Sequence, residues 1–385
     1  MDNYRSVKEF REPEEIFQTM IEEKSEMIDS EIGFLCGLIK EKRPHKILEV
    51  GVAAGGTTVA ILNCVHLLGQ SCEMFSLDLS EKYYRDNIRP TGFMVNELNK
   101  SILDTCKHQF ILGKTLPERI EEIGGEIDFL ILDTTHVMPG EVLDFIVALP
   151  YLAEHAVVVI HDTNFQFQYD MRDGIATSVL FQSVVADKYL NNQEFYPNIV
   201  AFEINNETKK YIVNVFLSLM TPWTYIPDRI QSDACRSVIE RFYDEQCLKI
   251  YDQAYLLSEK LIQREEKLKA KKLRDIEIYS KTMLSQVNIN RKLLIYGMGK
   301  RGKCLWKIIE NQSIDISGFI LSDGQPKDCI IGDKPIYYFS EIPFSKEDTL
   351  IILAIAAREV EEKLEKSGYV WAKISEENWT EIEKK

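Results

Sequence analysis

The sequence lacks several features that would indicate particular classes of protein. Its apolar runs are short, and the one at 350–357 falls well below the roughly 20 residues that a membrane-spanning helix needs. The N-terminus, MDNYRSVKEFREPEE, is polar and has no apolar core of a secretory signal. There is no basic excess, since 46 Lys and Arg face 61 Asp and Glu and the formal net charge is −15. Phosphate neutralisation supplies most nucleic-acid affinity, so we expect neither a nucleic-acid nor a membrane partner.

The eight cysteines form no recognisable pair. No C-x-x-C occurs, and no spacing suggests a zinc site. Scattered single cysteines are typical of a reducing compartment, and we therefore predict a cytoplasmic protein. The chain is 45% hydrophobic and 28% charged, which indicates a folded globular protein rather than disorder. A length of 385 residues predicts two or three domains.

Short runs of Val, Ile and Leu alternate with helical segments from residue 46 onwards. The expected strands cover 46–50, 74–79, 110–112, 127–132 and 156–160. Continuous apolar runs, in place of strict alternation, indicate strands that are buried on both faces. Strands separated by helices favour a parallel sheet with right-handed crossovers. We therefore predict an α/β fold with a Rossmann-like sheet.

Other patterns divide the rest of the chain. Helices are expected at 13–42, ended by Pro44, and at 177–190, with one more strand at 199–204. Residues 209–260 are aromatic-rich and mostly helical, and the charge run at 259–274 is typical of a solvated linker helix. A second strand–helix–strand pattern has strands at 293–296, 317–321 and 350–355 and a helix at 304–311. The predicted organisation is a helical segment (1–45), a core (46–205), a helical extension and linker (206–288) and a smaller Rossmann-like domain (289–385).

A glycine-rich turn joins the first strand to the following helix. Gly51, Gly55 and Gly56 allow a sharp turn and the close approach of a ligand to the backbone. The helix that follows offers unpaired N–H groups and the positive end of its dipole. Asp78 ends the next strand, about 20 residues beyond the glycines, where a carboxylate can hold two ribose hydroxyls. The pattern fits a nucleotide cofactor, and the alternative is a turn that only packs a helix on a strand.

The turn lacks the G-x-G-x-x-G of a pyrophosphate cradle and carries Glu49 two residues before its first glycine. This E-x-G-x-x-x-G form resembles the signature of class I S-adenosylmethionine-dependent methyltransferases, over roughly residues 30–260. The resemblance implies that Glu49 organises the turn near the methionine end of the cofactor and that Asp78 binds the ribose. The cofactor-binding residues it implies are Glu49, Gly51, Val52, Ala53, Gly55, Gly56, Thr57, Asp78, Leu79, Gly113 and Asp133. The chain departs from the family pattern at 154–156, which lacks Gly-Gly, and at 113–115, which has no acid for the adenine.

Acids and histidines follow two neighbouring strands of the predicted sheet. Asp133 and His136 follow one strand, and His161 and Asp162 follow the next. Ligands of open α/β sheets bind at the carboxyl ends of the strands. Carboxylates that converge there are costly unless they are paired or bound to a cation.

The D-x-x-H and H-D strand ends resemble a bacterial, metal-dependent O-methyltransferase-like subgroup, which includes relatives of macrolide-sugar O-methyltransferases and of cephalosporin hydroxylase. The resemblance implies that Asp133 and Asp162 bind a divalent metal, with His161 a weaker candidate ligand. It implies catalytic roles for Asp133 and for His136, the latter as general base. Oxygen ligands favour Mg²⁺, and an imidazole shifts the preference towards Mn²⁺. The alternatives left open are that Asp162 caps a loop, that His136 is an exposed loop residue and that Asp133 binds only the cofactor's amino group.

A second glycine-rich turn contains a true G-x-G-x-x-G. Gly297, Gly299 and Gly302 lie between a predicted strand and a helix, and Asp323 follows the next strand. The segment resembles small Rossmann-like domains attached to bacterial sugar-modifying and surface-polysaccharide enzymes. It is too short for a complete dehydrogenase, so we interpret it as a binding or oligomerisation module. A bound nucleotide and a fold without any ligand both remain open.

These features together predict an enzyme that transfers the methyl group of S-adenosylmethionine to a small-molecule acceptor. The resemblance favours an O-methyltransferase of a sugar, a glycan precursor or a secondary metabolite, as in bacterial polysaccharide biosynthesis, with metal assistance left open. Tyr83, Tyr84 and the segment around Trp223 wall the acceptor pocket or are packing residues. A metal-dependent hydroxylase of the cephalosporin-hydroxylase type is the first alternative. A non-catalytic nucleotide-binding protein is the second, and homo-oligomerisation is left open.

Overall fold

A computed structural model describes most of the chain. The described residues are 4–13, 26–86, 88–169, 171–191, 197–285, 291–311, 314–326, 334–355 and 357–373; side chains at 269 and 271–285 are excluded. The chain divides into two compact units, Met1–Ile262 and Gln263–Lys385, and each is described by itself. The helix expected at 13–42 falls partly outside the described residues, and its described part forms α2 (Asp29–Lys42).

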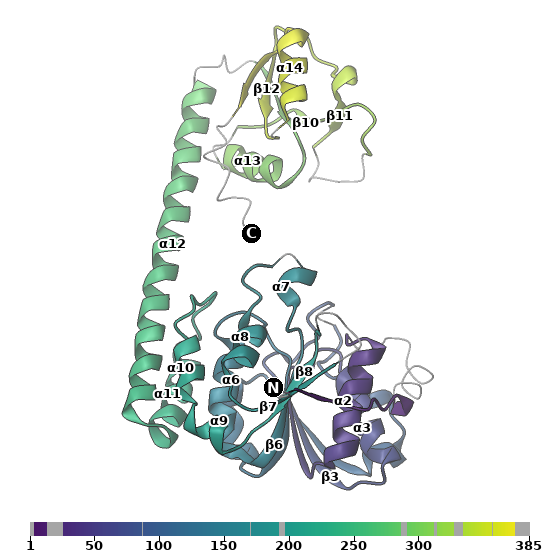
Figure 1. Cartoon of the computed structure of the whole chain (residues 1–385). Helices are drawn as coiled ribbons and strands as arrows, with labels where there is room; N and C mark the ends of the chain where they lie inside the picture. The colour runs from purple at the N-terminus through teal and green to yellow at the C-terminus, as the bar shows by residue number, and fades with distance from the viewer. Residues whose placement is uncertain are drawn as a thin grey trace. The chain divides into compact units, whose positions relative to one another are not determined.

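Eight strands of the described first unit form one sheet, in the order β1-β7-β8-β6-β5-β2-β3-β4 (Figure 1). The strands are β1 (Tyr4–Ser6), β2 (Lys46–Val50), β3 (Cys72–Asp78), β4 (Cys106–Leu112), β5 (Ile127–Leu132), β6 (Leu152–Ile160), β7 (Asp187–Leu190) and β8 (Val200–Glu203). All pairings are parallel except those that β8 makes with β6 and β7. The predicted α/β fold with a Rossmann-like sheet is confirmed, and each of the five strands predicted in its core lies in this sheet.

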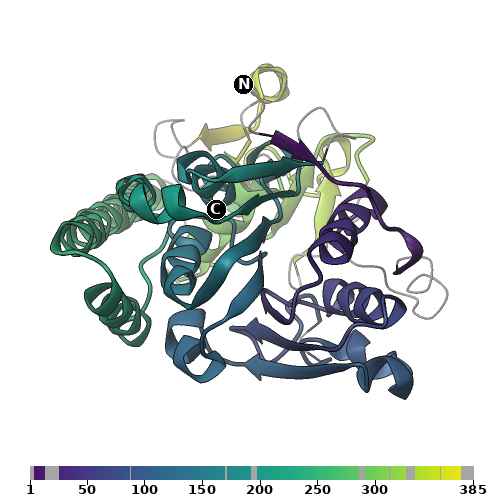
Figure 2. The same cartoon turned by 60° about the horizontal axis from the view of Figure 1, so that its bottom comes forward.

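Helices cover both faces of the sheet, as Figure 2 shows from a second direction. Among the described residues, the helices of this unit include α2, α3 (Gly56–Leu67), α4 (Lys100–Leu103), α5 (Leu116–Ile123), α6 (Gly140–Ala148), α7 (Phe165–Gln168), α8 (Ala176–Ser183), α9 (Asn206–Lys210), α10 (Val213–Ser218), α11 (Arg229–Phe242) and the start of α12 (Glu245–Ser285). Successive residues of β5 enter opposite layers: Phe129 packs with α2 and α3, and Leu130 packs with α5 and α6. Burial on both faces explains why the strands read as continuous apolar runs.

The aromatic-rich segment that follows β8 packs on the core of the first unit. Trp223 and Tyr251 are 3% and 2% exposed and belong to the same apolar cluster as Leu130 of β5. The Trp223 indole N–H donates to the carbonyl of Leu219 at 2.8 Å. These residues therefore complete the apolar layer on the α6 face of the sheet.

The helix expected at 177–190 is wrong in its second half. α8 ends at Ser183, and Asp187–Leu190 forms β7 between β1 and β8. Tyr189 is buried in the sheet, and its hydroxyl donates to Glu203 at 2.8 Å. Pairing with two strands outweighs the weak helical periodicity of this segment, because local propensity yields to tertiary contacts.

The second unit contains a parallel sheet of five strands in its described residues, in the order β11-β10-β9-β12-β13. Its elements are β9 (Lys292–Tyr296), α13 (Lys300–Glu310), β10 (Gly318–Leu321), β11 (Ile336–Tyr338), β12 (Thr349–Leu353), α14 (Arg358–Ser367) and β13 (Val370–Lys373). The smaller Rossmann-like α/β fold predicted here is confirmed, although β11, α14 and β13 were not foreseen. Among the described helices of both units, none is long and apolar enough to cross a membrane.

Candidate active site

One cavity of about 1240 Å³ opens at the carboxyl ends of the central strands. Predicted cofactor and metal residues share its wall: it is lined by Gly51, Val52, Ala53, Gly56, Thr57, Asp78, Leu79, Asp133, His136, His161 and Asp162. Tyr83 and Tyr84 also line it, whereas Trp223 is packed in the core. Three predicted cofactor residues do not line the cavity: Glu49, Gly55 and Gly113.

The glycine-rich turn has a backbone that only small residues can follow. Gly51 has φ +97°, and a Cβ there would lie 1.7 Å from the carbonyl oxygen of Asp133. Gly55 has φ +93° and contacts Gly92, and Gly113 has φ +73° beside Glu81. Gly51 is therefore required because the turn crosses directly over the end of β5, which brings the first turn and Asp133 together.

Asp78 closes this turn from the neighbouring strand. Its Oδ2 accepts hydrogen bonds from the backbone N–H groups of Val52 (2.9 Å) and Ala53 (3.2 Å). Its Oδ1 accepts from the Ser80 N–H at 2.8 Å. Leu79, the next residue, is 59% exposed although it is a large apolar side chain. A carboxylate beside an exposed apolar surface can hold the ribose and the base of a nucleoside.

Glu49 is buried beneath the turn. Its Oε2 accepts hydrogen bonds from the hydroxyls of Thr58 and Ser76, both at 2.7 Å, and its Oε1 has no partner among the described residues. Burial raises the pKa of Glu49 to about 8, even though the two hydroxyls act in the opposite direction. Glu49 is therefore mostly a neutral carboxylic acid at pH 7 in the unliganded protein.

The raised pKa of Glu49 predicts a pH-dependent stability. Between its usual value and about pH 8 the unfolded chain releases the proton and the folded chain keeps it, so the free energy of unfolding falls as the pH rises. Glu49→Gln removes this pH dependence. Between pH 5 and pH 8 the free energy of unfolding of the variant should rise by about 1–3 kcal/mol relative to that of the wild type. Urea denaturation at both pH values measures the difference. Glu97→Gln, at an exposed position, is the control for the loss of one negative charge, and a parallel response of the two variants contradicts the prediction.

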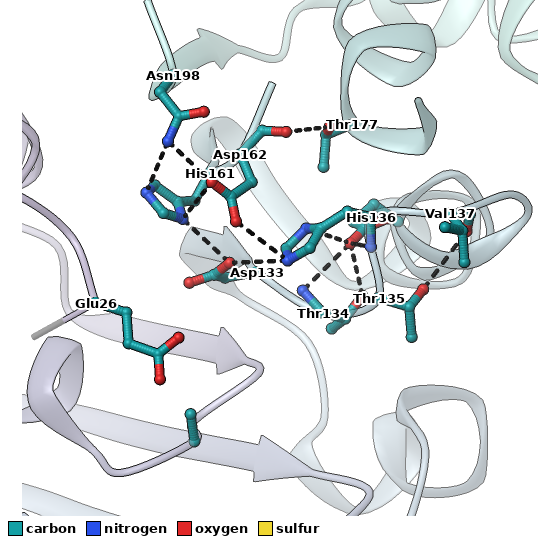
Figure 3. Close-up of polar contacts among 12 residues, drawn as sticks. Glu26, Asp133, Thr134, Thr135, His136, Val137, His161, Asp162, Thr177 and Asn198 are labelled. Carbon is teal, nitrogen blue, oxygen red and sulfur yellow. Dashed lines mark hydrogen bonds and ion pairs between the residues drawn. The ribbon is translucent and has the colours of Figure 1, made fainter. Parts of the chain in front are cut away.

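Two carboxylates and an imidazole converge at the far end of the cavity (Figure 3). Single donor atoms of Asp133, His136 and Asp162 all lie within 4.8 Å of one another. His136 Nε2 is 3.3 Å from Asp162 Oδ2 and 3.9 Å from Asp133 Oδ1. His136 and Asp162 both have positive φ, +59° and +57°, which is uncommon outside glycine. Local backbone strain of this kind is typical of functional sites.

His161 lies beside this group and is held by other partners. Its Nδ1 is 3.2 Å from Asp133 Oδ1, and its Nε2 is 3.2 Å from Glu31 Oε2. The Asn198 amide donates to both Glu31 and Asp162 at 2.9 Å. Burial alone would lower the pKa of His161, but the charges of Asp133 and Glu31 raise it well above the usual value. The surrounding carboxylates therefore favour the protonated ring of His161, and both of its ring nitrogens already face acids.

His136 is anchored from behind by Glu141. Glu141 Oε1 accepts the backbone N–H of His136 at 2.8 Å and lies 3.4 Å from His136 Nδ1. This leaves Nε2 pointing towards Asp133 and Asp162. Burial lowers the pKa of His136, but Glu141 and then the two aspartates outweigh it, so the net pKa is raised.

Sequence reasoning missed four residues of this site. Glu31 comes from α2, Glu141 and Asp144 come from α6, and Asn198 precedes β8. Glu31 and Glu141 resemble ordinary acids of a first helical turn, where they favour the helix dipole. Only the folded chain shows that both are buried and aimed at histidines.

The second glycine-rich turn is explained by packing. A Cβ on Gly302 would lie 2.0 Å from the carbonyl oxygen of Gly297, so glycine is needed where α13 crosses β9. Gly299 has open space around it. Asp323 Oδ1 accepts from the N–H and hydroxyl of Ser340, and Oδ2 accepts from Lys363 at 2.7 Å. A ribose would have to displace these partners, so the predicted nucleotide site stays a prediction.

Comparison with protein families identifies part of the chain. The model of a methyltransferase domain family matches residues 48–163, which include the first glycine turn, Asp78, Asp133 and Asp162. The match confirms the predicted enzyme class, an S-adenosylmethionine-dependent methyltransferase. A second model, described as C2185-like, N-terminal, matches residues 289–375.

Several solved structures resemble the methyltransferase part of the fold. The O-methyltransferase TomG from Streptomyces achromogenes is 13% identical, with 52% of this chain and 92% of that chain covered and a TM-score of 0.37. An O-methyltransferase from Bacillus cereus is 14% identical, with coverage of 50% and 89% and a TM-score of 0.35. The methyltransferase PaMTH1 from Podospora anserina is 11% identical, with coverage of 51% and 87% and a TM-score of 0.35. No curated protein matches the chain.

Proposed function

We propose that the protein transfers the methyl group of S-adenosylmethionine to a hydroxyl oxygen of a small-molecule acceptor. One observation carries the proposal: a single cavity joins the glycine turn and Asp78 to the group Asp133, His136 and Asp162. The methyl donor and the group that activates the acceptor would then meet at the end of β5. Methyl transfer is an in-line displacement, so alignment within one cavity is the protein's main contribution.

Residues 51–57, Asp78 and Leu79 would hold the cofactor in this proposal. The start of α3 would supply N–H groups to its amino-acid end. Asp78 Oδ1, which has one hydrogen bond from Ser80, would accept from a ribose hydroxyl, and the exposed Leu79 would contact the base. Asp133, whose carbonyl lies against Gly51, would complete the site beside the turn.

The donor set at the end of the cavity suits a divalent cation. Three donor atoms within 4.8 Å of one another can be spanned by one ion with ligands at roughly 2.0–2.6 Å. We assign the ligands to the carboxylates of Asp133 and Asp162, and we assign His136, which carries the third donor atom, to the role of base. His161 is not assigned as a ligand, because its ring nitrogens already face Glu31 and Asp133. A cation bound there lowers the pKa of the acceptor hydroxyl.

His136 accepts the proton of the acceptor hydroxyl. Its Nε2 faces the carboxylates, and its backbone is fixed by Glu141. Phe165 of α7 packs on its ring, with centroids 4.7 Å apart, and also lines the cavity. The ring is thus held in one orientation, which a general base requires.

The domain organisation and the class of the acceptor are also proposals. We propose the four-part organisation from the sequence, with the C-terminal unit as a separate binding module, and a sugar or glycan precursor as acceptor. The hydroxylase alternative is distinguished by the product, because methylation adds one methyl group and hydroxylation adds one oxygen. Mass spectrometry of product formed with S-adenosylmethionine decides between them.

Calorimetry with S-adenosylmethionine tests the cofactor site directly. The full chain should bind it, and Asp78→Ala should weaken binding about 10–100-fold because charge-assisted hydrogen bonds to the ribose are lost. Asp104→Asn, at an exposed position outside the cavity, should bind as the wild type does. Absence of binding by the wild type, with and without Mg²⁺, overturns the proposal.

A further inference from the structure

A second group of polar side chains lies in the same cavity, on the side formed by α6 and the segment before α11. Asp144 and Tyr225 both line the cavity there, together with Gln231 of α11. The segment that carries Tyr225 is fixed in place, because the Thr224 N–H donates to the carbonyl of Met138 at 2.9 Å. None of these three residues has a role in the transfer described above.

Asp144 is a half-buried carboxyl group that faces the cavity and has few partners. Its described hydrogen bond is a long one, 3.4 Å from Thr134 Oγ1 to Oδ2. Burial, followed by the nearby charge of Glu141, raises the pKa of Asp144 to about 8. A desolvated acid without a strong partner is costly, and a ligand in the cavity can supply that partner.

Glu141 adds negative charge behind Asp144. It is fully buried, Thr134 Oγ1 contacts it at 3.0 Å, and its Oε2 has no hydrogen-bond partner in the described part of the chain. Thr134 thus connects both acids, and it follows Asp133 directly. The acidic group is therefore adjacent to the reacting end of the cavity.

Most of the Lys and Arg side chains that line the cavity form ion pairs with other residues. Arg85 pairs with Glu26 at 3.3 Å, Lys114 pairs with Glu118 at 2.9 Å, and Arg89 pairs with Asp86. Within the described residues no Lys or Arg is recorded against Asp144 or Glu141. A positively charged group bound at this wall would favour the ionised form of Asp144 and would supply the partner that it lacks.

We infer that Asp144, Tyr225 and the buried Glu141 form a subsite for a protonated amino group of the methyl acceptor. An ammonium group has three N–H donors, which suit the Asp144 carboxylate and the Tyr225 hydroxyl oxygen. The acceptor is then an amino alcohol, in which the amine lies near the hydroxyl that is methylated. This inference rests on the proposed function, because it places the amine beside the group Asp133, His136 and Asp162.

Matched pairs of probes test the subsite on the full chain loaded with S-adenosylhomocysteine. Glucosamine is compared with N-acetylglucosamine, and ethanolamine with N-acetylethanolamine, so that acetylation removes the positive charge. We expect the amine of at least one pair to bind at least tenfold more tightly than its acetylated form, measured by ligand-observed NMR titration. Asp144→Asn should reduce this ratio to about twofold or less, and Asp233→Asn, exposed on α11, should keep it.

The outcomes separate this inference from the proposed function. If neither amine binds better than its acetylated form, or if the preference survives in Asp144→Asn, the subsite is wrong. Calorimetry with S-adenosylmethionine on the same samples shows whether the cofactor site still stands. Loss of cofactor binding in the wild type would instead remove the proposed function on which the subsite depends.

Discussion

Replacing Asp133 with asparagine should reduce methyl transfer by about a thousandfold. Asp133 contacts each part of the site. Gly51 of the first glycine turn packs on its carbonyl, and its Oδ1 is 3.2 Å from His161 Nδ1. Its carboxylate also belongs to the group Asp133, His136 and Asp162. Asparagine keeps the shape but removes the charge that offsets His161 and that would bind a cation. A metal ion held at this site would supply several kcal/mol of transition-state stabilisation, and each tenfold change in rate corresponds to about 1.4 kcal/mol.

The measurement is single-turnover methyl transfer at saturating cofactor, with the melting temperature as a check on folding. Asp128→Asn is a matched control, because it changes the same residue type near the other end of β5, where Asp128 accepts the N–H groups of His45 and Lys46. We expect the control to transfer methyl at close to the wild-type rate. Turnover of folded Asp133→Asn within tenfold of the wild type would show that Asp133 is not part of the transfer machinery.

The core strands and the first glycine turn could be predicted because their signals are local in the sequence. Each core strand is a continuous apolar run, and Gly51, Gly55 and Asp78 lie in one strand–turn–helix–strand unit. β7 was missed because four residues, Asp187–Leu190, carry little periodicity, and their strand conformation comes from pairing with β8. The topology of the sheet, not the segment itself, determines that element.

The partners of the histidines could not be predicted for a related reason. Glu31 and His161 are separated by 130 residues, and nothing near Glu31 marks it as different from other helix-start acids. Glu141 is only five residues from His136, yet its burial depends on how α6 packs on the sheet. Asp144 could not be recognised as a candidate binding residue, because the cavity that it lines also includes Tyr225, which is distant in the sequence. Local motifs therefore indicate candidate carboxylates and histidines, and the packing of the folded chain determines which residues contact them.

Substitution of His136 by alanine should lower kcat by about 10²–10⁴-fold and leave S-adenosylmethionine affinity within about twofold, because a general base acts in the transfer step.

In the wild type, kcat/KM should rise with pH, since only neutral His136 accepts a proton, and the midpoint should lie above the usual histidine pKa. Glu141→Gln removes the carboxylate that raises the pKa of His136 most, so this pKa falls and the rising limb moves to lower pH. Glu122→Gln, at an exposed position of α5, should not move it.

Metal binding by His136→Ala distinguishes the two possible roles of His136, as a general base or as a metal ligand. Its Nε2 lies close enough to Asp133 and Asp162 to be a third ligand, so proximity alone does not distinguish a base from a ligand. A base can be removed without loss of the cation, because the two carboxylates remain. Calorimetric titration of His136→Ala with Mn²⁺ should therefore match the wild type, while Asp162→Asn should bind Mn²⁺ at least tenfold more weakly. Equal loss of Mn²⁺ binding in both variants, together with a pH profile that Glu141→Gln leaves unchanged, would make His136 a ligand and leave the acceptor proton to solvent.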